Sequence, residues 1–270
     1  MSETLTLIPE TYRAPTHPSP SVISPADRYQ IYWSEASFAG RRNMTCPANR
    51  ETEILQSLET GRSITPPLGN QAAAYRLLKR ALDILGSLAL LLLLSPVMLT
   101  VLLVLLVTTR GRPLFAQRRV GYRGQTFTLW KFRTMRLDAD SVQHLVTNEK
   151  DGPIFKNRRD PRITRLGRLL RKTSLDETPQ LFNILAGHMA LVGPRPPVPA
   201  EVAQYKLWQL PRLAVMPGLT CLWQVSGRSE IDFRRWVRMD IWYVRNQGLA
   251  TDLRLLWKTP SSVLSCRGAY

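Results

Sequence analysis

The sequence is poor in cysteine and histidine, the residues that build disulfides and most transition-metal sites. Its three cysteines, Cys46, Cys221 and Cys266, are far apart in 270 residues, odd in number and without CxxC spacing. This pattern argues against a disulfide framework and against a zinc site, and it favours a reducing compartment. His144 and His188 have no acidic or cysteine partner at ligand spacing, so neither is a candidate metal ligand.

Other familiar patterns are also missing. No internal repeat is visible, and the N-terminus lacks a basic stretch followed directly by an apolar core, the pattern of a cleavable signal peptide. Residues 1–70 are rich in Pro, Ser, Thr and Glu and have no hydrophobic period. Such a segment buries too little apolar surface to fold alone. We expect a disordered N-terminal arm over 1–70, with a short helix near "RETEILQSLE".

Acidic residues are scarce: 20 Asp and Glu stand against 37 Lys and Arg, which gives a formal net charge of +17. Most of the excess follows residue 107, where 28 of the basic and 12 of the acidic residues lie. An anionic partner is expected, which could be a nucleic acid, an anionic lipid or a phosphorylated substrate.

One long apolar run is present, from Ile84 to Val107, with 24 uncharged residues. At about 1.5 Å per residue it is long enough to cross a bilayer. Basic residues flank both ends, so the positive-inside rule is best satisfied when both ends are cytoplasmic. Ser95-Pro96 lies in the middle, where proline removes a backbone donor and a serine hydroxyl can satisfy the freed carbonyl. Two interpretations stay open: an ordinary transmembrane helix, or a re-entrant helix–break–helix over 75–110.

The remainder, 111–270, reads as a mixed α+β and mostly helical domain. "TFTLWKFRT" alternates like a strand, and "TPQLFNILAG" predicts a helix with Pro179 in its first turn and Gly187 after its end. In the last helical part, one stripe is apolar and aromatic residues mix with arginine, which fits either an amphipathic helix in the membrane interface or a core-facing helix. The stripe consists of Phe233, Val237, Ile241 and Val244, with Trp236, Trp242, Tyr243 and Trp257 nearby.

Asp176 and Glu177 stand side by side after a strongly basic segment. Ser174-x-x-Glu177 matches a capping box, but Thr178 as N-cap with Pro179 at the first helical position fits equally well. Helix capping alone would explain one of the acids. A carboxylate here could instead hold a divalent cation, and an aspartate could attack phosphorus to form an acyl phosphate.

The basic segment supplies candidate phosphate ligands. The alternation in "KFR" places Lys131 and Arg133 on one face of a strand. In "PRITRLGRLLRK" the spacing by three or four predicts one helix face carrying Arg162, Arg165, Arg168 and Lys172. Converging guanidinium groups suit pyrophosphate, although basic residues beside a membrane helix also bind anionic lipids. In "GPRPP" the flanking prolines fix the backbone about Arg195.

In their order along the chain, these motifs resemble the bacterial sugar transferase family, the monotopic polyprenyl-phosphate phosphoglycosyl transferases. The resemblance runs from about Lys79 to the C-terminus and is carried by "KRALD", "SP", "KFRTM", "DPRITRLGRLLRKTSLDETPQ", "LVGPRP" and "PGLTCLWQVSGR". It implies a short form with one re-entrant membrane helix broken at Ser95-Pro96 and a catalytic domain over 111–270. That domain would lie on the cytoplasmic face of the bacterial inner membrane.

The resemblance also implies a two-step reaction. Asp176 would attack the β-phosphate of a UDP-sugar, release UMP and keep the phosphosugar, which the phosphate of a polyprenyl (undecaprenyl) lipid then collects. Glu177 would complete the dyad, with Mg²⁺ (or Mn²⁺) held by Asp176 and Glu177. Arg171 matches the position associated with the lipid phosphate, and Arg195 matches the nucleotide-sugar site. Further positions of the basic pocket are Lys131, Arg133, Arg162 and Arg165.

The implied partners are the UDP-sugar, the polyprenyl phosphate and the bilayer, with a second copy of the chain and downstream glycosyltransferases as further candidates. Nucleic acid is not expected. The "WQVSGR" ending is similar to members that transfer a hexose, and the product would start an exopolysaccharide or another surface glycan. The sequence departs from the family at Thr178, where a hydrophobic residue is usual, and at Cys221, where glycine is common.

Two other interpretations remain at this point. A membrane-anchored basic module would bind anionic lipid or nucleic acid without catalysis and would be indifferent to Asp176 and Glu177. An enzyme of another fold would join UDP-sugar and lipid phosphate in one step, with the carboxylates only holding metal.

Overall fold

The structure, a computed structural model, describes residues 71–149 and 152–265. The predictions for the arm over 1–70 lie outside these residues. The helices are α3 (Gln71–Thr108), α4 (Arg165–Lys172), α5 (Gln180–Leu185), α6 (Pro199–Val202), α7 (Phe233–Asn246) and α8 (Leu249–Leu264). The strands are β1 (Leu114–Val120), β2 (Thr126–Phe132), β3 (Ala190–Val192) and β4 (Gly218–Thr220). Short 3₁₀ segments join them: η1 (Tyr122–Gly124), η2 (Gln143–Leu145), η3 (Leu175–Glu177), η4 (Leu207–Ala214) and η5 (Arg228–Glu230).

The mixed and mostly helical class predicted from the sequence is confirmed. β1 and β2 form an antiparallel hairpin in which Leu114 pairs with Phe132 and Val120 pairs with Thr126. The alternating stretch "TFTLWKF" is therefore a strand, as its period predicted. β3 and β4 form a separate parallel pair.

Two glycines let the backbones of the parallel pair approach closely. A Cβ at Gly218 would lie 2.0 Å from the nitrogen of Gly193, and a Cβ at Gly193 would lie 2.3 Å from the oxygen of Met216. The main apolar core forms around this pair from β2, α5, β3, α7 and α8, with members that include Leu129, Ile184, Val192, Val244 and Leu255.

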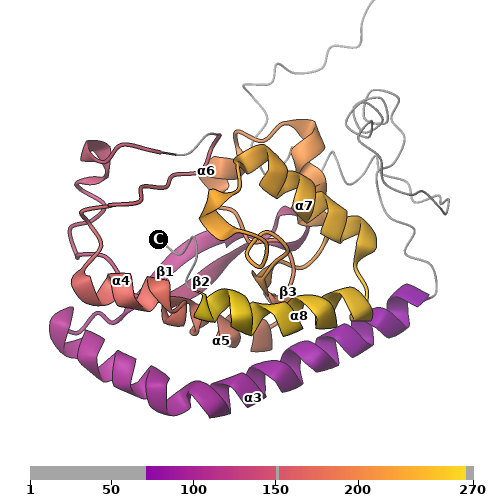
Figure 1. The fold of residues 1–270 in the computed structure, drawn as a ribbon, viewed down its shortest axis with the longest axis horizontal. Coiled ribbons are helices and arrows are strands. Elements are labelled where there is room, and N and C mark those ends of the chain that lie inside the picture. The colour runs from indigo at the N-terminus through magenta and orange to yellow at the C-terminus, as the bar shows by residue number, and fades with distance from the viewer. Residues whose placement is uncertain (1–70, 150–151, 266–270) are drawn as a thin grey trace, which may run out of the picture.

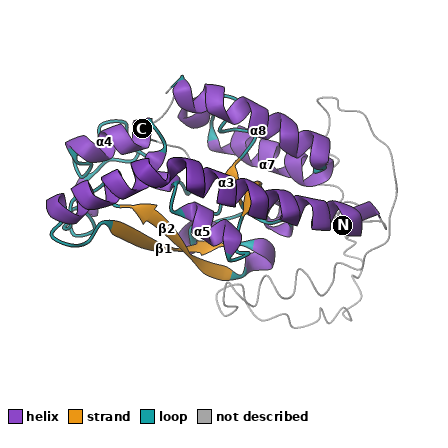
Figure 2. Ribbon diagram, turned by 90° about the horizontal axis from the view of Figure 1, so that it is seen from below, coloured by secondary structure: helices purple, strands orange, loops and turns teal. Residues whose placement is uncertain are grey.

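Helix α3 runs along one face of the domain, with α8 on one side and α5 on the other (Figures 1 and 2). Its N-terminal part is attached by buried polar groups. The carboxylate of Asp252 in α8 accepts hydrogen bonds from Tyr75 (2.8 Å), Lys79 (3.0 Å) and Tyr243 (2.7 Å). Asp83 accepts from the backbone N–H of Leu191 at 2.8 Å.

Arg80 adds a contact to the end of α5, donating to the carbonyl groups of Ile184 (2.6 Å) and Leu185 (2.8 Å). A guanidinium is favoured there because the last carbonyls of a helix lack helical donors and carry partial negative charge. The motif "KRALD" is thus a set of attachment points between α3 and the domain.

The predicted interruption at Ser95-Pro96 is a bend within one continuous helix. α3 stays helical through Pro96, and Figure 1 shows it bowed, with its convex side away from the domain. Proline cannot donate to the carbonyl of Leu92, and the Ser95 hydroxyl donates to that carbonyl instead at 2.8 Å. The serine therefore does what the sequence predicted, and the helix does not stop. α3 is the one helix of the described residues that is long and apolar enough to cross a membrane.

The C-terminal helices separate the two interpretations of the aromatic, arginine-rich end. The stripe of α7 faces the core: Phe233, Val237, Ile241 and Val244 are all buried. The interfacial interpretation of that stripe is wrong, because Val244 packs in a buried cluster with Leu191 and Val192 of β3, and the other three residues pack in a second cluster with Cys221 and Trp223. On α8, by contrast, Trp257 is 87% exposed.

Replacing Asp252 with Ala should unfold the domain at markedly lower temperature. The change removes the counter-ion of Lys79 and one of the two acceptors of Tyr243, and breaking a buried ion pair from one side costs about 3–5 kcal/mol. Thermal unfolding of purified protein measures it. Asp138→Ala is the matched control, since it removes an exposed ion pair worth at most about 1 kcal/mol. Equal melting temperatures for the two variants would contradict this account of the α3 attachment.

Candidate active site

Asp176 and Glu177 lie in the 3₁₀ turn η3, between the end of α4 and the start of α5. The chain reverses out of α4 at Ser174, whose φ of 58° is in the left-handed region. Ser174 makes no side-chain cap, so the predicted capping box is wrong. Thr178 is not the N-cap of α5 either: Pro179 occupies that position, and the Thr178 hydroxyl donates to the carbonyl of Leu175 at 2.9 Å. Asp176 and Glu177 nevertheless lie just before the N-terminus of α5.

Glu177 is fixed by two cations from distant segments. Its Oε1 atom accepts from Lys131 Nζ at 3.1 Å and from Arg195 Nη1 at 2.8 Å. Burial opposes ionisation, but Arg195 and then Lys131 outweigh it and hold the pKa of Glu177 well below its usual range. Burial in turn lowers the pKa of Lys131 to about 8, with Glu177 opposing that shift. Glu177 is therefore an anion near neutral pH, committed to these partners.

Arg195 is presented by a loop held through its carbonyl groups, because prolines have no N–H to donate. Each of four successive carbonyls accepts from a neighbouring element: Pro194 from Gly218 N (2.9 Å), Arg195 from Arg212 Nη2 (3.1 Å), Pro196 from Arg119 Nη1 (2.8 Å) and Pro197 from Val120 N (2.8 Å). The buried Arg212 is itself paired with Asp240 at 2.6 Å. The rigid loop predicted from "GPRPP" is confirmed.

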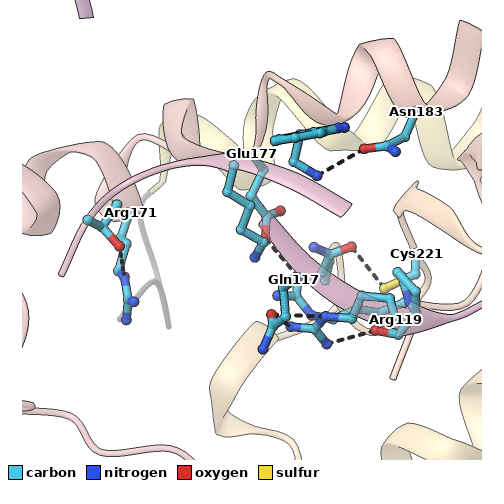
Figure 3. Close-up of polar contacts among 12 residues, drawn as sticks. Gln117, Arg119, Arg171, Glu177, Asn183 and Cys221 are labelled. Atoms are coloured by element: carbon cyan, nitrogen blue, oxygen red, sulfur yellow. Dashed lines mark hydrogen bonds and ion pairs between the residues drawn. The ribbon is translucent and has the colours of Figure 1, made fainter. Parts of the chain in front are cut away.

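Lys131 is positioned by the free edge of β2. No strand covers that edge in the described residues; instead Asn183 of α5 lies along it (Figure 3). The Asn183 side chain accepts from Trp130 N at 3.1 Å and donates to the Thr128 carbonyl at 2.7 Å, as a neighbouring strand would. This fixes α5, and with it η3, against the strand that carries Lys131.

Asp176 differs from Glu177 in its partners and in the direction of its pKa shift. It is 7% exposed, and neither carboxylate oxygen has a hydrogen-bond partner among the described residues. Burial and the adjacent Glu177 charge raise the pKa of Asp176 to about 6, while Lys131, Arg171 and Arg195 oppose the shift. A carboxylate that is buried, unpartnered and at the edge of a cavity has the properties of a reacting or ligating group.

Arg171, at the end of α4, reaches the same cavity. Its Nε donates to the Thr134 hydroxyl at 3.0 Å, and burial lowers the pKa of its guanidinium. α4 can lie this close to Thr134 because its first turn contains Gly167, where a Cβ would lie 2.0 Å from the Thr134 carbonyl oxygen.

Three of the predicted basic residues are placed differently from the expectation. Arg162 precedes α4 and forms a buried ion pair with Asp160 at 2.7 Å, so it does not share a helix face with the later arginines. Arg133 borders the cavity but donates to the carbonyls of Arg112 (2.8 Å) and Leu114 (3.1 Å). Arg165 is exposed and outside the cavity lining. The spacing by three or four predicted the helix correctly from Arg165 to Lys172, but residue 162 lies before the start of α4.

Several cavity residues were not predicted. Arg119 alternates correctly along β1 but has no motif around it, and burial together with Arg195 lowers its pKa to about 10. Gln117 holds the Arg119 guanidinium at 2.7 and 3.1 Å (Figure 3). Gln224 accepts from the buried Cys221 thiol at 2.9 Å, and Arg228 lies across from Ser174. The available signal was the strand period in "LFAQRRV", which places Gln117 and Arg119 on one face and Arg118 on the other.

These residues line one cavity of about 450 Å³. The lining includes Lys131, Arg119, Arg171, Arg195 and Arg228 together with Asp176 and Glu177. No cluster of three or more metal-ligating side chains occurs in the described residues. A divalent cation of the Mg²⁺ type is commonly held by one or two carboxylates plus substrate phosphates. Asp176 and the second oxygen of Glu177, both without a protein donor, fit that arrangement.

The comparisons with known proteins show the family of the chain. The family model described as bacterial sugar transferase matches residues 74–266. The chain belongs to the bacterial sugar transferase family. The match begins at the attachment segment of α3 and includes every residue of the cavity, so the membership covers nearly the whole described structure.

Three relatives in the family give its range. An undecaprenyl-phosphate galactose phosphotransferase of Salmonella typhimurium is 45% identical over 205 residues, which cover 72% of this chain and 42% of that protein. The exopolysaccharide production protein ExoY of Rhizobium meliloti is 39% identical over 210 residues, covering 76% and 90%. An undecaprenyl-phosphate glucose phosphotransferase of Komagataeibacter xylinus is 37% identical over 203 residues, covering 71% and 37%. The chain spans less than half the length of the Salmonella and Komagataeibacter relatives.

The raised pKa of Asp176 predicts a titration near pH 6, with the carboxylate ionised above that pH and protonated below it. Glu177→Gln should move the titration to lower pH, because it removes a like charge and releases Lys131 and Arg195. Carboxyl ¹³C NMR without divalent cations, with the resonance assigned by Asp176→Asn, measures the change. Glu201→Gln, which removes another cavity carboxylate, should leave the titration unchanged; a shift as large as that of Glu177→Gln would show that the pair is not specifically coupled.

Proposed function

We propose that the chain transfers a hexose-1-phosphate from a UDP-sugar to undecaprenyl phosphate, and so starts the assembly of an exopolysaccharide or another surface glycan. The unpartnered carboxylate of Asp176 beside the cation-bound carboxylate of Glu177, in a cavity lined by arginines, is the observation that carries the proposal. The names of the relatives, with their galactose and glucose phosphotransferases, support a hexose.

In the first step, an Asp176 oxygen bonds to the β-phosphorus of the UDP-sugar while the bond from that phosphorus to the bridging oxygen breaks. UMP leaves, and the phosphosugar stays on the aspartate. In the second step, an oxygen of the lipid phosphate attacks the same phosphorus and frees Asp176. The aspartate, rather than the glutamate, is assigned as nucleophile because Glu177 is already committed to Lys131 and Arg195.

The cations have separate roles in this proposal. Arg195 and Lys131 orient Glu177 and neutralise phosphoryl oxygens beside it, while Arg171 is assigned to the lipid phosphate. Mg²⁺, when held by Asp176 and Glu177 with the substrate phosphates, would supply further stabilisation of charge on the transferred phosphoryl group. Arg133, Arg162 and Arg165 have no place in the chemistry, since their side chains are engaged elsewhere or lie outside the cavity.

We further propose that α3 is re-entrant, so that both its ends lie on the cytoplasmic face. Two observations support this. The N-terminal part of α3 is attached to α5, α8 and β3, and Leu105 near the other end packs with Phe132 and Leu170 of the same domain. A helix of 38 residues is about 57 Å long, well above the roughly 30 Å of a bilayer core. Two ends bound to one globular domain are not readily separated by a membrane.

The non-catalytic basic module is less well supported. Such a module needs interchangeable surface charges, whereas Lys131, Arg195 and Arg171 each have a defined partner in an enclosed site. Association with a membrane is supported for the enzyme and for the basic module alike, by the apolar helix and by a further relative, named UDP-galactose-lipid carrier transferase.

Replacing Asp176 with Asn should reduce UMP release from a UDP-hexose, assayed with Mg²⁺ and undecaprenyl phosphate, on the order of a thousandfold or more. A radiolabelled phosphosugar should be trapped on the wild-type chain before lipid is added, and not on this variant. Asp138→Asn, the same change at an exposed site outside the cavity, is the control. UMP release by Asp176→Asn at the wild-type rate would contradict the proposed mechanism. Turnover by the wild-type chain without a trapped adduct would favour the one-step route.

Cysteines placed at Arg76 and Ala116, both exposed, should react with a membrane-impermeant maleimide from the same side of the membrane. Cys46 and Cys266 are replaced by Ser for this experiment, and the buried Cys221 is kept. Labelling from opposite sides would rule out the re-entrant helix.

A further inference from the structure

Arg228 enters the cavity from a segment to which no role in the chemistry has been assigned. It follows the tight turn after β4, where its backbone N–H donates to the Trp223 carbonyl at 3.0 Å. Its own φ is 50°, in the left-handed region that side chains other than glycine seldom occupy. Residues in such conformations cluster at active sites and ligand-binding turns, where the surrounding structure holds them.

A second left-handed residue lies opposite. Ser174, with φ 58°, is the residue at which the chain turns towards Asp176, and its hydroxyl is 3.5 Å from Arg228 Nη2. The two residues are 54 positions apart in the sequence. Two independent turns thus use an unfavourable backbone conformation at the same wall of the same cavity.

The guanidinium of Arg228 is not matched by any acid of the described residues. Lys131 and Arg195 are paired with Glu177, and Arg162 with Asp160. Arg228 forms no ion pair, and its one side-chain hydrogen bond is the long contact to Ser174. A planar group with several unused donors in a cavity is suited to two oxygens of one phosphate.

The position of Arg228 relative to Asp176 indicates which phosphate of the nucleotide-sugar it binds. In the proposed reaction Lys131 and Arg195, which bind Glu177, act on the attacked phosphoryl group, and Arg171 is assigned to the lipid phosphate. Arg228 lines the same cavity from another segment, beside Ser174, two residues before the nucleophile. In a nucleoside diphosphate sugar the second phosphate is joined to the attacked one through a single bridging oxygen, so it lies within reach of a further cation in this cavity.

We infer that Arg228 binds the α-phosphate of the nucleotide-sugar, the group that leaves as UMP. This rests on the proposed function. When the bond from the β-phosphorus to the bridging oxygen breaks, the electron pair goes to that oxygen, and Arg228 stabilises the charge that develops on UMP. The residue is therefore a ligand of the first substrate and of its product, and not of the lipid.

Binding of UMP to the purified full-length chain, measured by isothermal titration calorimetry, tests the inference without turnover. Arg228→Gln should weaken UMP binding by about tenfold to a hundredfold, the range for a charge-assisted hydrogen bond, and Arg228→Lys by less. Uridine, which lacks the phosphate, should bind the wild type and Arg228→Gln equally. The KM for polyprenyl phosphate should not change in either variant.

Arg123→Gln is the matched control, because Arg123 is also left-handed, with φ 53°, but lies in the β1–β2 turn outside the cavity. It should bind UMP as the wild type does. If Arg228→Gln does not fold, Arg228→Lys decides the matter. Wild-type UMP affinity in the folded Lys variant, or a rise only in the KM for polyprenyl phosphate, overturns the inference. A wild type that binds UMP through Arg228 but releases none from any UDP-hexose would refute the proposed function and leave this phosphate site standing.

Discussion

The candidate site depends on one carboxylate, that of Glu177, which accepts hydrogen bonds from two cationic side chains. Glu177 joins the β1–β2 hairpin, through Lys131, to the proline-rich loop after β3, through Arg195. Asp176 lies next to Glu177 in the same 3₁₀ turn, η3. Because Glu177 uses its charge on these partners, Asp176 is left with burial, a neighbouring anion and no donor of its own. The pKa values of these two neighbouring carboxyl groups are therefore shifted in opposite directions by their surroundings.

The proline-rich loop shows how such a contact is kept rigid. Three of the four residues from Pro194 to Pro197 have no N–H to donate, and the carbonyls of all four are bound, one after another, by Gly218, Arg212, Arg119 and Val120. Two of these donors are guanidinium groups, those of the buried Arg212 and the half-buried Arg119. Part of the positive charge of the domain therefore holds backbone in place, and Arg119 does so while it also lines the cavity.

The sequence predicted what has a local period or a named motif. The strand over Thr126–Phe132, the loop about Arg195, the acid pair and the hydroxyl that rescues the Leu92 carbonyl all depend on near neighbours. The failures depend on distant contacts. Arg228 and Arg119 reach the cavity that Asp176 lines only through the tertiary fold. The sequence left the stripe of α7 open between the membrane interface and the core for the same reason, since an amphipathic stripe does not say whether protein or lipid covers it.

Leu170 and Arg171 are adjacent in α4 but belong to different environments. Leu170 packs with Leu105 of the apolar helix, and Arg171 reaches into the cavity. One peptide unit therefore separates the side chain that supports the apolar helix from the side chain that reaches the cavity. Under the proposed function, a long-chain lipid can present its phosphate to Arg171 while its tail stays in the bilayer, so that the lipid need not be extracted. Encounter then becomes a search in two dimensions, and its rate follows the surface density of the lipid and not its bulk concentration.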